Sequence, residues 1–302
     1  IETYPKHVDY LNNDIAPDLI IFLKSKLNNK KNKSYYNFLL RIGEDVGLFT
    51  NEQIELIDYL SDMLPLVRPY EYFIIKEVLN NNHNIDKIKD AIQEYIYSFD
   101  VSVYNHALMI LKKYNQGRVI TITNNEIHIN INLDNKVKEY LFDLLEYGLV
   151  RYDIEFGEFT GIFKLYANYY KEQVMLCLLQ DGLMFVKGTK IEEDGTIYLF
   201  VGLKKDRREE HLQYIDKFLT DSILQWESET NVTVNSTIGR KLINSKVAHV
   251  FIRKVESENG VTLPFTYIGT GKMILTNKKS DNPKPTLIFD VILDRKIPEY
   301  LK

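Results

Sequence analysis

The stretch ILQWESETNVTVNSTIGRKL, residues 223–242, decides how the second half of this chain is interpreted. Its first residues predict a strand, since Leu224, Trp226, Ser228 and Thr230 fall on alternate positions and would share one face. A run rich in Ser, Thr, Asn and Gly follows. Trp226 is the only tryptophan of the chain and would have hydroxyl groups on its own face. We therefore expect either a binding surface around this indole ring or a core position for it.

Strand patterns recur on both sides of this stretch. Residues 182–205 contain two strand patterns joined by a turn at Asp194 and Gly195. One helix is expected before them, at about residues 170–180. Regular strands with few helices indicate a small curled sheet or barrel. The further strands are predicted at residues 246–255, 265–275 and 285–293.

Helical patterns dominate the first half of the chain. Thr50 and Gln53 form a capping box at the start of one helix, and Asp134 is the expected N-cap of another. Asn124 and Asn125 separate two alternating segments and predict a short hairpin. The helices are expected at residues 17–27, 50–64, 69–79, 84–99, 102–114 and 134–149.

The change from helical to strand periodicity predicts an α+β protein with two domains. Residues 1–156 would form a helical bundle with a small winged hairpin, and residues 157–302 a curled β-sheet or barrel with few helices. With 302 residues, 45% of them hydrophobic, both domains can bury a core. Residues 157–302 carry 21 basic and 19 acidic side chains, whereas residues 1–156 carry 17 and 23. Contact with a polyanion is therefore expected from the second domain.

The remaining composition limits where the protein acts. Cys177, the only cysteine, lies in the apolar run VMLCLL, which favours a buried thiol in a reduced, cytoplasmic protein. No apolar stretch approaches the roughly 18 residues that a membrane span needs. The sequence begins with Ile1 and not with Met, so we expect a segment of a longer polypeptide.

No catalytic motif is complete. IGTGKMI, residues 268–274, lacks the earlier glycine and the following Ser or Thr of a phosphate-binding loop. DNK, residues 134–136, is the nearest match to a metal-nuclease motif, but an N-cap role explains its Asp. The histidines lack the spacing of a zinc site. We expect no catalytic residue, metal site or cofactor in this segment.

Aromatic and basic residues are interleaved in the second domain. Most of the aromatic rings are expected in the core, because a small barrel must be filled. Base-stacking rings combined with cations are nevertheless what nucleic-acid binding requires. The aromatic residues are Tyr198, Phe200, Trp226, Phe251, Phe265, Tyr267 and Phe289. The basic residues are Arg240, Lys241, Lys246, Arg253, Lys254, Lys272, Lys278, Lys279 and Lys284.

These segments resemble a known family. Residues 224–242 together with VFIRK (250–254), PFTYIGTGKM (264–273) and KPTLIFDVIL (284–293) are similar to the C-terminal domain of bacterial helicases that also carry a phospholipase-D-type nuclease. Leu224 stands where the family has an aromatic residue, and Glu229 where it has glutamine. The matching residues are Trp226, Ser228, Ser236, Gly239, Phe251, Arg253, Phe265, Tyr267 and Gly269.

The resemblance extends to the SauUSI-type, ATP-dependent type IV restriction endonucleases, which act on modified DNA. It implies that residues 157–302 are an SRA-like domain that recognises 5-methylcytosine in double-stranded DNA by base flipping. Residues 1–156 would be the coupler to the helicase and nuclease domains of the same parent chain. ATP and Mg²⁺ would belong to that helicase part.

The resemblance leads to two sets of candidate site residues. Glu227 or Glu229 would accept from the cytosine amino group. In a regular strand both glutamates point away from Trp226, so they can share its pocket only if the strand ends or bulges near Ser228. The candidate modified-base pocket comprises Trp226, Ser228, Glu229, Glu227, Tyr198 and Tyr267. Contacts to the DNA backbone are expected from Arg240, Lys241, Arg253, Lys272, Lys278 and Lys279.

Two other interpretations stay open. One is a regulatory protein with a winged helical module and a β-domain that binds a small ligand. The other is an intact metal nuclease. Preferential binding of a methylated duplex would favour the DNA reader over the regulator, and magnesium-dependent cleavage would favour the nuclease.

Overall fold

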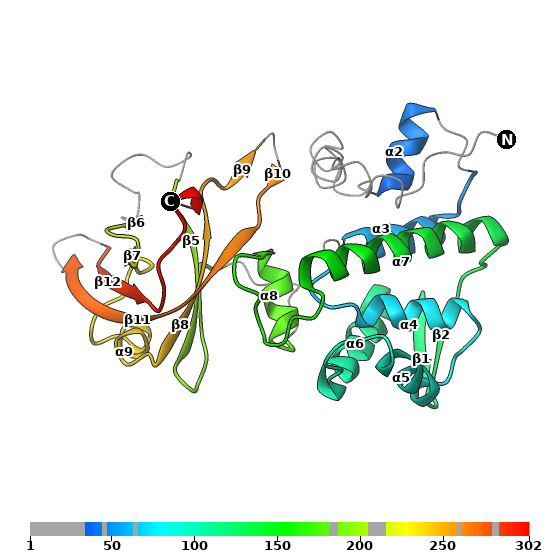
Figure 1. The fold of residues 1–302 in the computed structure, drawn as a ribbon, viewed down its shortest axis with the longest axis horizontal. Helices are drawn as coiled ribbons and strands as arrows, with labels where there is room; N and C mark the ends of the chain where they lie inside the picture. Colours follow the sequence, from blue (N-terminus) through cyan, green and yellow to red (C-terminus); the bar gives the residue numbers. More distant parts are fainter. Residues whose placement is uncertain are drawn as a thin grey trace. The chain divides into compact units, whose positions relative to one another are not determined.

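The computed structural model describes residues 34–43, 47–62, 66–180, 187–204, 216–258, 261–279 and 284–301. The chain divides into two compact units, Ile1–Gly161 and Ile162–Lys302. The first unit is mainly helical and the second is built on a large sheet (Figure 1). This confirms the α+β class, with helices in the N-terminal part and a strand-rich C-terminal part. The helix predicted at residues 17–27 lies outside the described residues.

The first unit is a helical bundle with one hairpin. α3 and α4 both contact α7, the longest helix among the described residues, and their buried side chains form the core of the unit (Figure 1). Its elements are α2 (Tyr35–Ile42), α3 (Asn51–Asp62), α4 (Tyr70–Leu79), α5 (Ile85–Gln93), α6 (Val101–Lys113), η2 (Tyr114–Gly117), β1 (Ile120–Thr123), β2 (Glu126–Ile129) and α7 (Asn135–Phe156).

The helix starts follow the capping signals of the sequence. At α3, the Thr50 N–H donates to Gln53 Oε1 over 2.7 Å, and the Gln53 N–H donates to Thr50 Oγ1 over 3.3 Å. At α7, the Asp134 carboxylate accepts from the Val137 N–H over 3.0 Å. Each bond satisfies a donor that the helix itself leaves unpaired. Asp134 therefore has a structural role as the N-cap of α7.

One glycine lets α4 approach α7 closely. A Cβ placed on Gly148 would lie 2.2 Å from Cε1 of Tyr72, so the tyrosine ring rests on the α7 backbone. Tyr72 is fully buried. Only glycine fits at this crossing, since any side chain would meet the ring.

The hairpin turns at two asparagines, as predicted. Asn124 and Asn125 have φ angles of 49° and 63°, the left-handed conformation that a tight two-residue turn needs. The tip is held by α5 and the residues before it, because Asn125 Nδ2 donates to Asp86 Oδ2 over 2.6 Å and the Ile127 N–H donates to the His83 carbonyl over 2.9 Å. The hairpin is thus fastened to its own helical bundle.

The second unit is built on one sheet with short helices around it. β7 begins with the alternating burial that the sequence predicted, whereas β5, β8 and β12 contain runs of consecutive buried residues, since both faces of the sheet are covered there. Its elements are β3 (Asn168–Tyr169), α8 (Lys171–Cys177), β4 (Thr189–Ile191), β5 (Thr196–Gly202), β6 (Lys217–Phe218), β7 (Ile223–Glu227), α9 (Thr237–Ile243), β8 (Val247–Arg253), β9 (Ser257–Glu258), β10 (Val261–Thr262), β11 (Phe265–Lys279), β12 (Thr286–Leu293) and η4 (Glu299–Leu301).

The strand order of the sheet is β4-β5-β8-β11-β12-β7-β6, and β3 pairs with β11 beside this path. β5 and β8 run parallel, whereas the other pairs within the sheet are antiparallel. The register sets Trp226 of β7 opposite Phe289 of β12. This order places β4 and β7 near opposite margins of the sheet.

The central strand β11 curls the sheet. Its pairing shifts at two places, between Tyr267 and Gly269 and between Leu275 and Asn277. Such bulges bend a strand and increase its twist. At Gly271, a Cβ would lie 2.7 Å from the Ile292 carbonyl oxygen, so glycine allows a close approach to β12. Figure 1 shows β11 sweeping in a long arc through the unit.

Strand alternation gives the sheet two distinct faces. Ala248, Val250 and Ile252 of β8 belong to the core that also contains Trp226 and Phe289. We call this side the Trp226 face. The side chains between them on β8, such as Phe251, contact aromatic rings on the opposite side, which we call the Tyr267 face.

Candidate functional site

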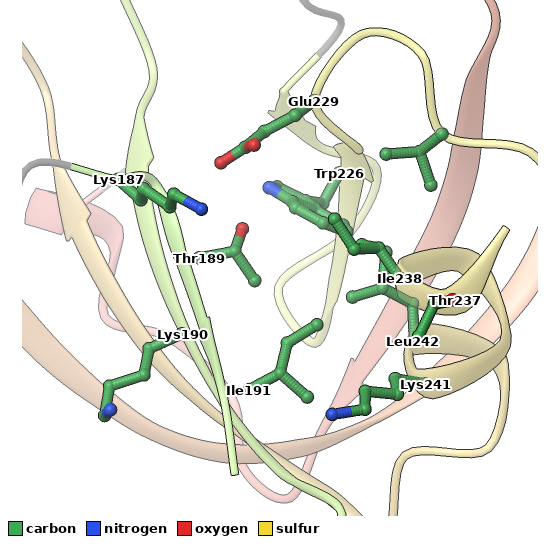
Figure 2. Close-up of a pocket in the computed structure, with 11 residues that line it drawn as sticks. Lys187, Thr189, Lys190, Ile191, Trp226, Glu229, Thr237, Ile238, Lys241 and Leu242 are labelled. Atoms are coloured by element: carbon green, nitrogen blue, oxygen red, sulfur yellow. The ribbon is translucent and has the colours of Figure 1, made fainter.

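A pocket of about 300 Å³ opens on the Trp226 face. β4 supplies one wall, while β7 and α9 supply the other (Figure 2). Four strands, β5, β8, β11 and β12, lie between β4 and β7 in the sheet, so it is the curl that brings these walls together. The pocket is lined by Lys187, Thr189, Lys190, Ile191, Trp226, Glu229, Val232, Thr237, Ile238, Lys241 and Leu242.

The α9 wall is fixed by a serine and a glycine. Ser236 Oγ accepts from the Gly239 N–H over 3.0 Å and donates to the Thr233 carbonyl over 2.8 Å. A Cβ on Gly239 would lie only 1.9 Å from that carbonyl oxygen. The helix start therefore packs directly on the preceding loop, and Ser236 and Gly239 determine where Ile238 and Leu242 meet the pocket.

Trp226 belongs both to the core and to the pocket. Its side chain is 5% exposed, and its ring lies 5.8 Å from that of Phe289 at an angle of 37°. Figure 2 shows the indole nitrogen directed into the space among Glu229, Lys187 and Thr189. The exposed part is too small for a base to stack on the ring face. Trp226 instead offers the pocket an edge with one N–H donor.

The end of β7 separates the two candidate glutamates. Glu227 is buried, accepts from Thr286 Oγ1 over 2.6 Å and does not line the pocket. β7 ends at Glu227, and the chain then brings the exposed Glu229 into the pocket beside Trp226. Ser228 is fully buried, and its Oγ accepts from the Leu287 N–H over 2.9 Å. Of these three candidates, only Glu229 shares the pocket with the indole.

Tyr198 and Tyr267 lie on the Tyr267 face, away from Trp226. The Tyr198 ring stacks on His249 at 5.1 Å, and Tyr267 Oη lies 2.8 Å from His249 Nδ1. Burial raises the pKa of both tyrosines to about 12 and lowers the pKa of His249, so all three side chains are neutral at pH 7. The Tyr267 hydroxyl and His249 Nδ1 therefore share a hydrogen bond between two neutral groups. Phe163 packs edge-on against this cluster, which forms a second core.

Arg253 also belongs to the Tyr267 face. Its guanidinium lies 4.3 Å from the centre of the Phe265 ring and 3.3 Å from a carboxylate oxygen of Glu256. Nη1 donates to the Leu263 carbonyl over 3.3 Å. Burial lowers its pKa. These contacts assign Arg253 to packing around the β9–β10 hairpin.

The other predicted backbone contacts lie in two places. Arg240 and Lys241 are exposed on α9, and Lys241 lines the Trp226 pocket. Lys272 is exposed on β11 and does not line this pocket. Lys278 and Lys279 pair through their backbones with β12, and their side chains lie outside the described part of the structure.

The two units coincide with two sequence families. Residues 2–154 match a family described as Domain of unknown function (DUF8090). The chain belongs to the DUF8090 family. Residues 163–301 match a second family, described as Domain of unknown function (DUF3427). No curated protein matches the chain. The Trp226 pocket lies wholly within the DUF3427 match.

Sequence reasoning missed the β4 side of the pocket in this DUF3427 region. Lys187, Thr189 and Ile191 line it, and Figure 2 shows the Thr189 hydroxyl facing the space beside the indole. The strand before the turn at Asp194 was predicted, and alternation places Thr189 and Ile191 on one face. Nothing in a linear pattern indicates that this edge strand would meet β7.

No group of three or more His, Cys, Asp or Glu side chains is arranged to hold a metal ion within the described ranges. Among the helices that the structure describes, none combines the length and the apolar composition needed to cross a membrane.

Proposed function

We propose that the second unit recognises 5-methylcytosine in double-stranded DNA by taking the extruded base into the Trp226 pocket. The chain would then be the recognition part of a cytoplasmic, ATP-dependent restriction endonuclease, with its helicase and nuclease domains elsewhere in the parent chain. The first unit would couple the reader to those domains. This proposal combines the family resemblance with the geometry of the pocket.

One observation supports the proposal most: Glu229 and the Trp226 N–H meet in one apolar-walled pocket next to Lys187 (Figure 2). The Watson–Crick edge of cytosine carries an amino donor and ring acceptors. Glu229 would accept from the amino group, and the indole N–H would donate to a ring acceptor. Ile191 and Leu242 would surround the methyl group.

Burial of the methyl group does not by itself supply the free energy needed to extrude and bind the base. Extruding a base costs a few kcal/mol. Burying one methyl group contributes about 0.8 kcal/mol, roughly a fourfold preference over cytosine. The hydrogen bonds of Glu229 and the contacts to phosphates would therefore supply most of the binding energy, while the apolar wall supplies the preference for the methylated base.

The direct test is binding of the full chain to three duplexes that differ at one position, carrying methylcytosine, cytosine or thymine, each paired with its complement. Fluorescence anisotropy would give the three dissociation constants. We expect methylcytosine to bind most tightly. Equal binding of all three duplexes would contradict the proposed function. Tight binding of an unrelated small molecule without DNA binding would favour the regulatory alternative.

Glu229→Gln should reduce the preference for methylcytosine over thymine by about tenfold. Thymine has the same methyl group, but it presents an oxygen where cytosine presents the amino group, and the carboxylate of Glu229 would repel it. A glutamine amide can rotate to donate to that oxygen. The matched control is Glu258→Gln, which removes an exposed carboxylate on β9, outside the pocket. An unchanged thymine-to-methylcytosine ratio in Glu229→Gln would exclude Glu229 from base recognition.

A further inference from the structure

A second hollow adjoins the Trp226 pocket. It has a volume of about 360 Å³ and shares Ile191 and Lys241 with the first. The two hollows therefore lie side by side along the α9 wall, and we refer to them together as the depression. The second hollow is lined by Ile191, Glu192, Glu193, Asp194, Gly195, Arg240, Lys241, Asn244 and Lys246.

Four exposed cations line the two hollows, and none of them forms an ion pair with a carboxylate among the described residues. Lys246 lines only the second hollow and lowers the pKa of Asp194, which sets it apart from the other three. Lys187 lies on the β4 side, and Arg240 and Lys241 lie on α9. Figure 2 shows Lys187 and Lys241 at separate positions around the Trp226 indole. We call these three residues the cationic rim.

Two of the carboxylates near the second hollow are already engaged. Glu192 lies 3.2 Å from Lys190 Nζ and accepts from Gln180 over 3.0 Å. Asp194 accepts from the Thr196 N–H over 2.8 Å and from its hydroxyl over 3.1 Å. These contacts lower the pKa of Asp194, chiefly through the Thr196 N–H. Together with the exposed Glu193, these carboxylates place negative charge on one side of the hollow. An anion would therefore be held on the α9 side, beside Arg240 and Lys241.

We infer that the ligand of this depression is a continuous DNA strand, with the phosphates on either side of the extruded base held by the cationic rim. Lys187 would contact the phosphate on one side, and Arg240 with Lys241 the phosphates on the other. This inference rests on the proposed function and makes it more specific, because a free nucleoside or a small ligand would leave the rim unused. The observation that supports this inference most is that cations lie on both walls of the Trp226 pocket.

The test measures how the affinity of the full chain for the methylcytosine duplex depends on salt. Each phosphate contact contributes about 0.9 to the slope of log K against log salt. Lys187→Ala should lower the slope by about 1, and the double variant Arg240→Ala/Lys241→Ala by about 1 to 2. Both should weaken methylated and plain duplexes by the same factor, because phosphates carry no base information.

The controls separate this inference from the proposed function. Lys217→Ala and the double variant Lys217→Ala/Lys254→Ala remove the same numbers of exposed charges outside both hollows, and their slopes should equal the wild-type slope. Binding of 5-methyl-2′-deoxycytidine, which has no phosphate, should be the same in all variants. Wild-type slopes in the rim variants would overturn the inference while leaving the methyl preference intact. Failure of the wild-type chain to bind any duplex would overturn both proposals.

Discussion

Trp226→Ala is expected to destabilise the second unit by about 3–5 kcal/mol, the usual cost of removing a large buried aromatic side chain. The indole is 5% exposed and packs against Phe289 in the core of the Trp226 face. Its loss would leave a cavity that the surrounding strands β7 and β12 cannot fill. Denaturant titration followed by circular dichroism would measure the effect. A variant that unfolds at the wild-type denaturant concentration would contradict the core role.

Trp226→Phe separates the core role from the recognition role. Phenylalanine keeps an aromatic ring against Phe289 but lacks the indole N–H that faces the pocket (Figure 2). We expect a folded variant, with a smaller loss of stability than in Trp226→Ala and a reduced preference for methylcytosine. A folded Trp226→Phe chain with the full wild-type preference would show that the indole N–H takes no part in recognition. Because Trp226 is the only tryptophan, its fluorescence in the wild-type chain also reports directly on occupancy of the pocket.

Gly239→Ala is expected to cost about 1–3 kcal/mol or more and to disrupt the α9 wall. The new Cβ would lie 1.9 Å from the Thr233 carbonyl oxygen, a distance at which the backbone of the loop or of the helix must move. The move would displace Ile238 and Leu242 from the pocket. Thermal melting and methylcytosine-duplex binding, measured on the same sample, would show the lost stability and the lost preference together.

Gly202→Ala is the matched control for this substitution. A Cβ at Gly202, the last residue of β5, has no atom within 4 Å and lies in the same unit. Its melting temperature and binding should stay close to those of the wild-type chain. Equal behaviour of Gly239→Ala and Gly202→Ala would mean that α9 shifts without cost, and that its position does not define the pocket.

Local patterns predicted α3 to α8 and the longer strands, but they missed α2, the short strands β3, β6, β9 and β10, and α9, which lies in the polar run after Trp226. The capping box of Thr50 and Gln53 and the N-cap at Asp134 act over three residues, so the sequence contains all that they need. The turn at Asn124 and Asn125 likewise follows from the left-handed conformation that asparagine tolerates. The alternation of residues along a strand also depends only on neighbours in the chain, and it correctly predicted that Leu224 and Trp226 share one face.

The candidate site was only partly predictable. Trp226, Glu229 and Lys241 were named from the sequence and do line one pocket, but Tyr198 and Tyr267 lie on the other face of the sheet. A linear pattern gives the alternation within each strand but not the phase between strands, which depends on register. The bulge between Tyr267 and Gly269 shifts that register locally, and the hydrophobic periodicity of the sequence does not predict this bulge.

By itself, the sequence determined most of the helices, the longer strands, the turn at Asn124 and Asn125 and the residue types available for a binding site, because these depend on interactions between residues close in the chain. Only the tertiary structure decided that β4 faces β7, since the curl of β11 brings together two strands that four others separate in the sheet. It also decided that Glu229, and not Glu227, reaches the indole, because β7 ends at Glu227 and the backbone changes direction there. The register between strands and the curvature of the sheet depend on many contacts between residues far apart in the chain. Both are therefore fixed only when the whole sheet has formed.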